Sequence, residues 1–174
     1  MQRGRSPQYG TSAIQIIKSG QARGYEKFDF STKYYASTNF VLDERKLQKG
    51  DILINSTGVG TAGRVTLFNL DGDYCVDSHI TIFRPNERVI PKYALYALAD
   101  IGFKNIEKMA NGASGQIELS LSVIKNIEIP LPSLEQQKAI VAQIEVCETE
   151  INRAQAFIDR YSDKKNEILD KYLQ

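Results

Sequence analysis

The order of apolar and polar residues divides the chain into two parts. Up to about residue 132, short apolar runs are interrupted by Gly, Pro, Asn and Asp, a pattern typical of strands joined by turns. From residue 133 onward neither Gly nor Pro occurs, and apolar residues recur at helical spacing. The boundary lies at Pro130-Leu131-Pro132, because proline fixes its own φ and disfavours helical geometry in the residue before it. We therefore expect a globular domain over residues 1–132 and one long helix over residues 133–174.

The first part is predicted to mix short strands with short helices. The segments expected as strands, from their β-branched and alternating apolar residues, are 13–17, 50–55, 64–68, 77–83 and 127–131. A helix is expected over 91–98, with Pro91 in its first turn, and a second over 104–110. Ser120 is expected to cap a further short helix. The predicted fold class is α/β (α+β), followed by one long coiled-coil α-helix.

The long helix is predicted to begin with a capping box between Ser133 and Gln136. Beyond it, apolar residues occupy the a and d positions of a heptad, interrupted only by Lys165. They are Ile140, Ile144, Cys147, Ile151, Ala154, Ile158, Tyr161, Ile168 and Tyr172. A helix of about 40 residues is about 60 Å long, more than a small domain can cover. We therefore predict that the stripe from Ile144 to Tyr172 pairs with a second helix outside this chain; the alternative is an amphipathic helix that folds back on its own domain.

Composition and charge narrow the class of protein. The content of 42% hydrophobic and 25% charged residues is ordinary for a soluble domain, and no run is apolar enough to span a membrane. Cys75 and Cys147 lie in unlike sequence far apart, which predicts neither a disulfide framework nor a zinc site. The N-terminus lacks the apolar core of a secretory signal, so a cytoplasmic location is expected. Residues 1–49 hold nine Lys and Arg against four Asp and Glu, and this basic surplus is the minimum that phosphate binding requires.

A glycine-rich segment, Asn55 to Arg64, follows a predicted strand. Gly58, Gly60 and Gly63 match the G-x-G-x-x-G dinucleotide-binding pattern, which requires a helix to follow. Residues 64–68 are β-branched and aromatic, so a strand is expected instead and a dinucleotide-binding fold is disfavoured. The simplest interpretation is a glycine-rich hairpin loop.

Three groups of residues are candidates for contacts with nucleic acid. In the glycine loop, short polar side chains and an arginine suit phosphates and base edges; they are Ser56, Thr57, Thr61 and Arg64. The N-terminus supplies Arg3, Arg5, Gln8 and Tyr9, for which a disordered basic tail is the alternative. Gln116 follows residues 111–115, for which a flexible loop is expected; the alternative to a DNA contact there is a plain connection. His79 is the only histidine, and a lone histidine on a strand is usually structural.

The sequence carries no pattern typical of catalysis. No serine–histidine–aspartate arrangement, nuclease-like carboxylate cluster, Walker motif or cysteine–histidine metal spacing is present. We therefore expect a binding protein rather than an enzyme, with no metal and no cofactor of its own.

Several ordered blocks resemble one family over nearly the whole chain. The blocks are Leu47-x-Lys49-Gly50-Asp51-Ile52-Leu53-Ile54, Ser56-Thr57-Gly58-x-Gly60-Thr61-x-Gly63-Arg64, Asp77-Ser78-His79-Ile80-Thr81-Ile82-x-Arg84-Pro85, Gly115-Gln116-x-Glu118-Leu119-Ser120 and Ile127-x-Ile129-Pro130-Leu131-Pro132-x-Leu134-Glu135-Gln136-Gln137-x-Ala139-Ile140-Val141. Together they resemble the specificity subunits of type I restriction-modification systems. The agreement of several blocks is far more specific than one glycine loop.

The resemblance implies a target recognition domain over residues 1–132 and a spacer helix over 133–174. In that family two such halves lie in tandem, each reads one part of a split double-stranded DNA site, and their helices pair antiparallel. The resemblance further implies that methyltransferase subunits dock on the helices and that a restriction and translocation subunit joins them. This chain departs from the family pattern in two ways. It carries one half only, and family members usually have a further strand-bearing segment upstream of the segment with which this chain starts. It is therefore a half-sized subunit, a rearranged product or a fragment.

Three hypotheses follow. In the first, the chain reads a DNA half-site and pairs with a second copy, or with a different half-subunit, to recognise an interrupted site. The residues expected to contact DNA are Arg3, Arg5, Gln8, Tyr9, Ser56, Thr57, Thr61, Arg64, His79 and Gln116, with Arg64 foremost. In the second, the chain is an adaptor without DNA binding that regulates the restriction complex through its C-terminal helix. In the third, the glycine loop serves a small nucleotide-binding enzyme.

Overall fold

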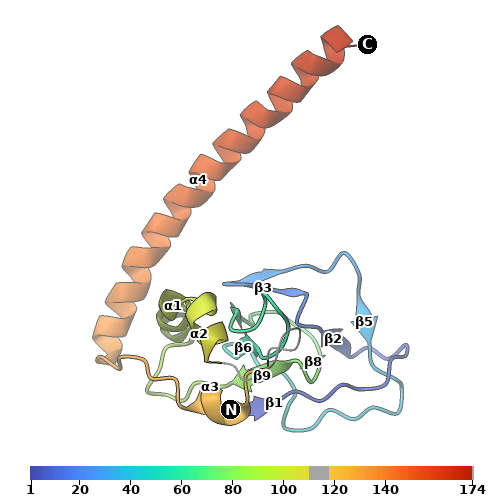
Figure 1. The fold of residues 1–174 in the computed structure, drawn as a ribbon, viewed down its shortest axis with the longest axis vertical. Coiled ribbons are helices and arrows are strands. Elements are labelled where there is room, and N and C mark those ends of the chain that lie inside the picture. Colours follow the sequence, from blue (N-terminus) through green and yellow to red (C-terminus); the bar gives the residue numbers. More distant parts are fainter. Residues whose placement is uncertain (110–117, 174) are drawn as a thin grey trace. The chain divides into compact units, whose positions relative to one another are not determined.

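The computed structural model describes residues 1–109 and 118–173 (Figure 1). The chain forms two compact units, Met1–Leu134 and Glu135–Gln174. The first contains all the described strands and three short helices, and the second is formed by one long helix. This confirms the predicted fold class of mixed strands and short helices followed by a long helix.

The largest sheet of the first unit has four strands in the order β1-β9-β6-β7. They are β1 (Gln2–Arg3), β9 (Ile80–Phe83), β6 (Ile52–Asn55) and β7 (Val65–Leu67), and every neighbouring pair is antiparallel. The central strand β6 is buried along its whole length, which explains its unbroken apolar run. Its neighbours are set in register by Leu53 opposite Ile82 and Thr66.

A second sheet and a small hairpin complete the strands. The three-stranded sheet has the order β5-β2-β8, with β5 (Tyr34–Tyr35) antiparallel and β8 (Tyr74–Val76) parallel to β2 (Gln15–Ile17). The hairpin consists of β3 (Ala22–Gly24) and β4 (Lys27–Phe28).

One hydrophobic core cluster lies between the two sheets. Buried side chains from both sheets and from the segments beside them pack together: Ile17, Ala22, Leu47, Leu53, Phe68, Val76, Ile80 and Ile82. The ring of Phe68 meets those of Phe28 and Tyr74 edge to face, at centroid distances of 6.4 and 5.3 Å. This core fixes the ends of β6 and β9, where the candidate functional residues lie.

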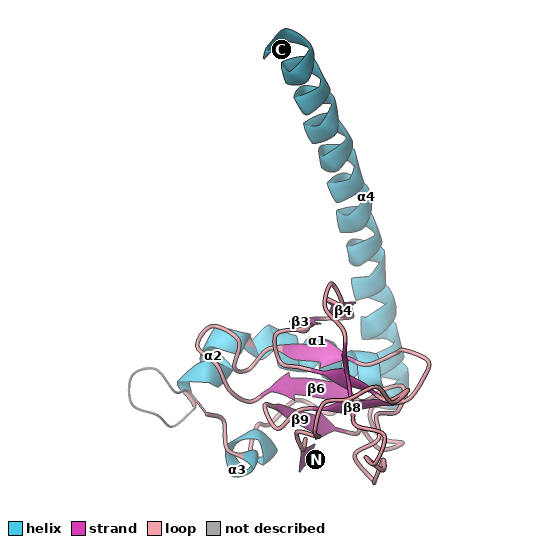
Figure 2. Cartoon of the chain, turned by 90° about the vertical axis from the view of Figure 1, so that its right-hand side faces the viewer, coloured by secondary structure: helices cyan, strands magenta, loops and turns pink. Residues whose placement is uncertain are grey.

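The helices of the first unit are α1 (Pro91–Ile101), α2 (Phe103–Lys108) and α3 (Leu121–Lys125). Helix α1 packs against β6 and β7 (Figure 2). Pro91 occupies its first turn as predicted, since a missing N–H costs nothing there. The hydroxyl of Ser120 accepts from the N–H of Val123 at 3.2 Å, which confirms it as the cap of α3.

The strand predicted over 127–131 is wrong, because this segment joins no sheet among the described residues. Pro130 has no N–H to donate to a ladder. Its carbonyl instead accepts a hydrogen bond of 2.9 Å from the hydroxyl of Tyr93 in α1. The apolar residues there therefore serve a connection rather than a sheet.

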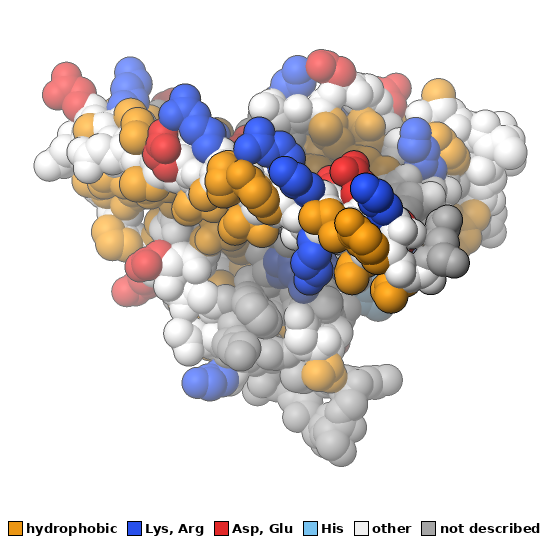
Figure 3. Space-filling model, turned by 90° about the horizontal axis from the view of Figure 1, so that it is seen from above, with side chains coloured by type: hydrophobic (Ala, Val, Ile, Leu, Met, Phe, Trp, Pro, Cys, Tyr) orange, Lys and Arg blue, Asp and Glu red, His pale blue; other side chains and the backbone are white. Residues whose placement is uncertain are grey.

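Helix α4 (Leu134–Leu173) is continuous over 40 residues. Of the heptad residues predicted to pair, Ile144 is half-buried and the others, from Cys147 to Tyr172, are exposed. Ile151 is 65% exposed and Tyr172 75% exposed. Figure 3 shows that hydrophobic side chains and the side chains of lysine and arginine gather in adjacent strips along this helix.

Candidate nucleic-acid interface

The glycine-rich segment is the loop of a hairpin between β6 and β7. The N–H of Gly63 donates to the carbonyl of Asn55 at 2.8 Å, and the N–H of Asn55 donates to the carbonyl of Arg64 at 2.9 Å. Because a strand follows the glycines, this is not a dinucleotide-binding turn. Gly58 has a φ of 102°, and a Cβ there would lie 2.5 Å from Oγ1 of Thr61, so only glycine fits.

The tip of this loop is exposed and is stabilised by hydrogen bonds inside the loop. Gly58, Val59 and Gly60 are exposed, while Thr61 is half-buried below them. The hydroxyl of Thr61 lies 3.1 Å from the carbonyl of Thr57 and 3.2 Å from that of Gly58. Its proton therefore stabilises the loop, and its oxygen keeps a lone pair for an outside donor.

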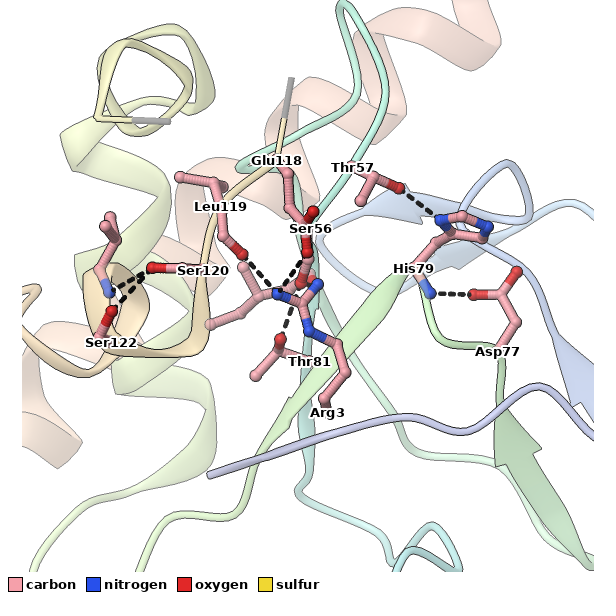
Figure 4. Close-up of polar contacts among 12 residues, drawn as sticks. Arg3, Ser56, Thr57, Asp77, His79, Thr81, Glu118, Leu119, Ser120 and Ser122 are labelled. Atoms are coloured by element: carbon pink, nitrogen blue, oxygen red, sulfur yellow. Dashed lines mark hydrogen bonds and ion pairs between the residues drawn. The ribbon is translucent and has the colours of Figure 1, made fainter. Parts of the chain in front are cut away.

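Thr57 and His79 meet at the open end of the sheet (Figure 4). Oγ1 of Thr57 lies 2.7 Å from Nδ1 of His79, and the imidazole is exposed. The backbone N–H of His79 donates to Oδ1 of Asp77 at 2.9 Å, which fixes the turn that carries the ring. Thr57 follows β6 and His79 precedes β9, so two of the predicted DNA contacts lie side by side at neighbouring strand ends.

Ser56 does not face solvent, contrary to the expectation that it contacts DNA. Its side chain is fully buried, and its hydroxyl lies 2.7 Å from Oγ1 of Thr81 and 3.1 Å from the carbonyl of Ile54. The alternation of side chains turns Ser56 inward while Thr57 turns outward. We therefore remove Ser56 from the candidate contacts.

Arg3 serves the fold, although it was expected at the interface. Its guanidinium donates to the carbonyl of Leu119 at 2.5 Å and lies 3.6 Å from the carboxylate of Glu118 (Figure 4). Burial lowers the pKa of Arg3, an effect that Glu118 opposes. The N–H of Leu119 in turn donates to the carbonyl of Ser56 at 2.8 Å. Arg3 therefore ties the N-terminal strand and the 118–119 segment to the base of the glycine loop.

The N-terminal segment is docked, which rules out the alternative of a disordered tail. The N–H of Gly4 donates to the carbonyl of Ile80 at 2.8 Å, and a Cβ on Gly4 would lie 2.1 Å from the carbonyl of Asp77. The hydroxyls of Ser6 and Ser78 lie 3.0 Å apart. Arg5 is exposed between these anchors, next to the turn that carries His79.

Gln8 and Tyr9 lie in a second exposed group, beside a lysine that the sequence did not single out. Both are exposed, Tyr9 by 61%. The ammonium of Lys18 lies 5.7 Å from the ring centre of Tyr9 and 4.6 Å from that of Tyr34. A hydrogen bond with Tyr9 raises the pKa of Lys18, against the opposing effect of partial burial. Lys18 and Tyr34 are 16 positions apart and carry no shared motif.

Arg64, the foremost candidate, is half-buried rather than fully presented. Its stem lies beside Gly24, and its Nη2 is 3.4 Å from the carbonyl of Gly60. Its Nη1 is buried and has no partner among the described residues, so it keeps an unused donor. Gln116 lies outside the described residues.

Part of the N-terminal basic surplus is neutralised by ion pairs. Lys46 pairs with Asp73 at 2.5 Å and Lys49 with Asp71 at 2.7 Å, and both of these acids lie outside residues 1–49. Within residues 1–49, Arg23 pairs with Asp29 at 2.7 Å and lowers the pKa of that carboxyl to about 2. Arg5 has no ion pair within the part of the chain that the structure describes.

Among residues 1–109 and 118–173, no group of three or more His, Cys, Asp and Glu residues is placed to hold a metal ion. No described helix is both long and apolar enough to cross a membrane.

Comparison with known proteins shows what this arrangement is similar to. A specificity subunit of a type I restriction enzyme in Methanocaldococcus jannaschii is 31% identical over 133 residues, which are 74% of this chain and 28% of that protein. A second, in Haemophilus influenzae, is 32% identical over 106 residues, 60% of this chain and 26% of that protein. The chain thus spans less than a third of the length of either relative.

Solved structures share the fold at low sequence identity. A chain from a study of assembly and conformational transition in the type I restriction-modification system covers 97% of this chain and 42% of its own length, at a TM-score of 0.70 and 22% identity. The match to the HsdS subunit of Thermoanaerobacter tengcongensis covers 89% of this chain and 36% of that subunit, at a TM-score of 0.64 and 18% identity. The family described as the type I restriction modification DNA specificity domain matches residues 11–156. With most of its length matched, the chain belongs to the type I restriction-modification DNA specificity family.

Proposed function

We propose that the chain reads one half of a split DNA site for a type I restriction-modification enzyme and is not itself catalytic. The observation that carries the proposal is the docking of the basic N-terminal segment along the turn that carries His79. This docking sets the exposed Arg5 beside the turn whose histidine contacts Thr57 at the foot of the glycine hairpin. Arginine and histidine donors beside a glycine backbone suit phosphates and base edges.

The proposed contacts fall into two groups. Thr57, Thr61, Arg64 and His79 lie in or beside the glycine loop, and Arg5 lies in the N-terminal segment docked beside the turn of His79. Tyr9 lies near Lys18, and Gln8 precedes it in the chain. Gln116 stays a prediction for the same surface. Arg3 is not among the proposed contacts, because its half-buried guanidinium is bound to the 118–119 segment that supports the loop.

We further propose that α4 pairs antiparallel with the α4 of a second copy. With a and d positions facing each other, the layers that form are Ile140 with Tyr172, Ile144 with Ile168, Cys147 with Lys165, Ile151 with Tyr161 and Ala154 with Ile158, each occurring twice. The exposed apolar side chains of α4 are thereby covered over most of the helix.

The flanking charges favour this antiparallel pairing over a parallel one. In the antiparallel register Glu150 of one copy lies opposite Lys164 of the other, twice, and Val141 lies opposite Leu169. In a parallel pair in register, Lys165 would face Lys165 inside the apolar seam, where two ammonium groups repel and are poorly solvated. Glu150 already pairs with Arg153 on its own helix at 2.6 Å, but an exposed pair of this kind is weak and exchanges readily.

The rest of the proposed assembly follows from the family. Methyltransferase subunits would dock on the paired helices and supply the S-adenosylmethionine chemistry, and a restriction and translocation subunit would join them. The chain itself would need no cofactor or metal. Two copies related by a two-fold axis would read inverted half-sites at a separation fixed by α4.

Fluorescence anisotropy with the full chain and a labelled random-sequence duplex tests DNA binding. We expect the logarithm of the affinity to fall linearly with the logarithm of salt concentration, because Lys and Arg displace counterions from phosphates. Binding that does not depend on salt, or no binding at low salt, contradicts the proposal. Capture of methyltransferase subunits without any DNA affinity would instead support an adaptor that acts through its C-terminal helix.

A further inference from the structure

A cleft of about 330 Å³, lined largely by polar and charged residues, opens beside the turn that carries His79. Three separate stretches line it, 18–21, 29–34 and 77–79. Sites for small ligands usually have volumes of about 300–1,000 Å³, so this cleft suits a ligand of one or two rings. Because Nδ1 of His79 meets Thr57, the cleft adjoins the glycine hairpin.

The cleft contains a buried carboxylate with an unused oxygen. Asp77 is 3% exposed, and its Oδ1 accepts the N–H of His79. Its Oδ2 is buried and has no hydrogen-bond partner among the described residues. Burial raises the pKa of Asp77, and the backbone N–H groups of His79 and Ser19, with the charges of His79 and Lys18, oppose the effect. A buried acceptor without a donor costs free energy, so a ligand that brings a donor is stabilised here.

A cation stands at the same cleft. The ammonium of Lys18 is held against the rings of Tyr34 and Tyr9, at 4.6 and 5.7 Å from their centres. Ammonium groups only donate hydrogen bonds. The cleft therefore offers one strong acceptor, from Asp77, and one strong donor, from Lys18.

This pairing selects the chemistry of the ligand. A metal ion or polyamine is disfavoured by the charge of Lys18, and a bare phosphate is disfavoured by the carboxylate of Asp77. A neutral ring with an amino donor next to an acceptor nitrogen matches both. Cytosine and adenine carry such an edge, and the rings of Tyr34 and His79 offer planar surfaces for stacking.

We propose that this cleft binds an unstacked cytosine or adenine, with Asp77 accepting from the exocyclic amino group and Lys18 donating to the neighbouring base acceptor. A base stacked within a duplex cannot reach a carboxylate as deeply buried as that of Asp77, so the base must leave the stack. The base comes either from DNA, in which case the inference rests on the proposed function, or from a free nucleotide.

Calorimetric titration of the full chain with cytidine 5′-monophosphate and with uridine 5′-monophosphate tests the chemistry. Uracil carries a carbonyl in place of the amino group, so we expect the cytidine nucleotide to bind at least about fivefold more tightly. Asp77→Asn preserves shape and the acceptor for the His79 N–H but places a donor at the unused position, so it is expected to abolish the preference. Asp29→Asn is the matched control, because that carboxylate lines the same cleft but is paired with Arg23, and the preference should remain.

The comparison of the two nucleotides with the wild-type chain needs no variant. If Asp77→Asn does not fold, Lys18→Gln is the second variant, and it should weaken binding of the cytidine nucleotide. Duplexes with a single unpaired cytosine or thymine then distinguish the two sources. A cytosine preference there identifies DNA, and a preference seen only with free nucleotides identifies the nucleotide. Equal affinity for the cytidine and uridine nucleotides, or binding of neither of these nor of adenosine 5′-monophosphate, overturns the proposal for the cleft. Salt-dependent binding to an intact duplex, measured in parallel, shows whether the proposed function stands or fails separately.

Discussion

Arg84 and Asp51 form a two-pronged ion pair that closes the base of the four-stranded sheet. Nε of Arg84 lies 2.7 Å from Oδ1 of Asp51, and Nη2 lies 2.8 Å from Oδ2. The carboxylate is fully buried, whereas the side chain of Arg84 is 36% exposed. The N–H of Gln48 donates to the same carboxylate at 2.8 Å. The pair thus fastens the turn before β6 to the end of β9, opposite the end that carries Thr57 and His79.

Replacing Arg84 with methionine leaves the carboxylate of Asp51 buried without its cation. We expect the free energy of unfolding to fall by about 2–3 kcal/mol, less than the roughly 3–5 kcal/mol for a fully buried pair, because Arg84 is partly exposed. Urea unfolding followed by circular dichroism measures this. Lys49→Ala is the control, because its pair with Asp71 is exposed and should contribute less than about 1 kcal/mol. Equal losses in the two variants would contradict this account of the pair.

The family blocks in the sequence contained both of these residues, but nothing local showed that they meet. Asp51 and Arg84 are 33 positions apart and join through pairing of β6 with β9. The same limitation explains Arg3, whose strand has two residues and pairs with Thr81 across the chain. A strand that short has no measurable period, so its side chain was assigned to DNA on composition alone.

Local patterns predicted the elements that local physics determines. The hairpin around the glycines follows from β-branched residues on both sides of a turn, and α4 follows from a heptad and the absence of Gly and Pro. The inward direction of Ser56 depends on the exact residue at which β6 ends, which a pattern gives only within a few residues. The cleft depends on three segments meeting, so Lys18, Tyr34 and Asp77 carried no joint signal.

The two cysteines are expected to differ sharply in reactivity. Cys75 is 3% exposed, and burial raises its pKa to about 12, whereas Cys147 on α4 is exposed. Only the thiolate reacts, and at pH 8 a thiol with that pKa is ionised to the order of 10⁻⁴. A disulfide reagent should therefore titrate one thiol in the folded chain and two in denaturant. Rapid reaction of both thiols in the folded chain would show that Cys75 is not buried as described.

Cys147 also reports on pairing, because it lies in the proposed seam. Its reaction should slow as the protein concentration rises and copies of α4 pair. A rate independent of concentration, over a range in which sedimentation shows monomers associating into dimers, would place the contact elsewhere.

Arg5 and His79 are expected to contribute differently to DNA binding. Arg5→Ala should weaken binding to all duplexes and lower the slope of log affinity against log salt by about 1, as loss of one phosphate contact does. His79→Ala should instead reduce the preference between sequences, because the imidazole is presented beside the loop that we propose faces the bases. Anisotropy titrations at several salt concentrations separate the two effects. If His79→Ala leaves sequence preference unchanged, the ring does not read the site.

Charge reversal tests the antiparallel register of α4. Lys164→Glu places like charges opposite each other twice in the pair, so we expect the dimer to weaken by about 1–2 kcal/mol, or roughly 5- to 30-fold in Kd. Adding Glu150→Lys to the same chain restores opposite charges and should recover most of the loss. Sedimentation equilibrium measures both. If the double variant is as weak as the single one, these two residues do not face each other.

The most direct test of the central claim is the selection of DNA sites from a random duplex library by the full chain. A reader whose copies pair through antiparallel helices should enrich two inverted copies of one short motif, separated by a constant number of base pairs. Enrichment of one uninterrupted motif, of two motifs at variable separation, or of no motif would contradict a pair of recognition domains held apart by α4.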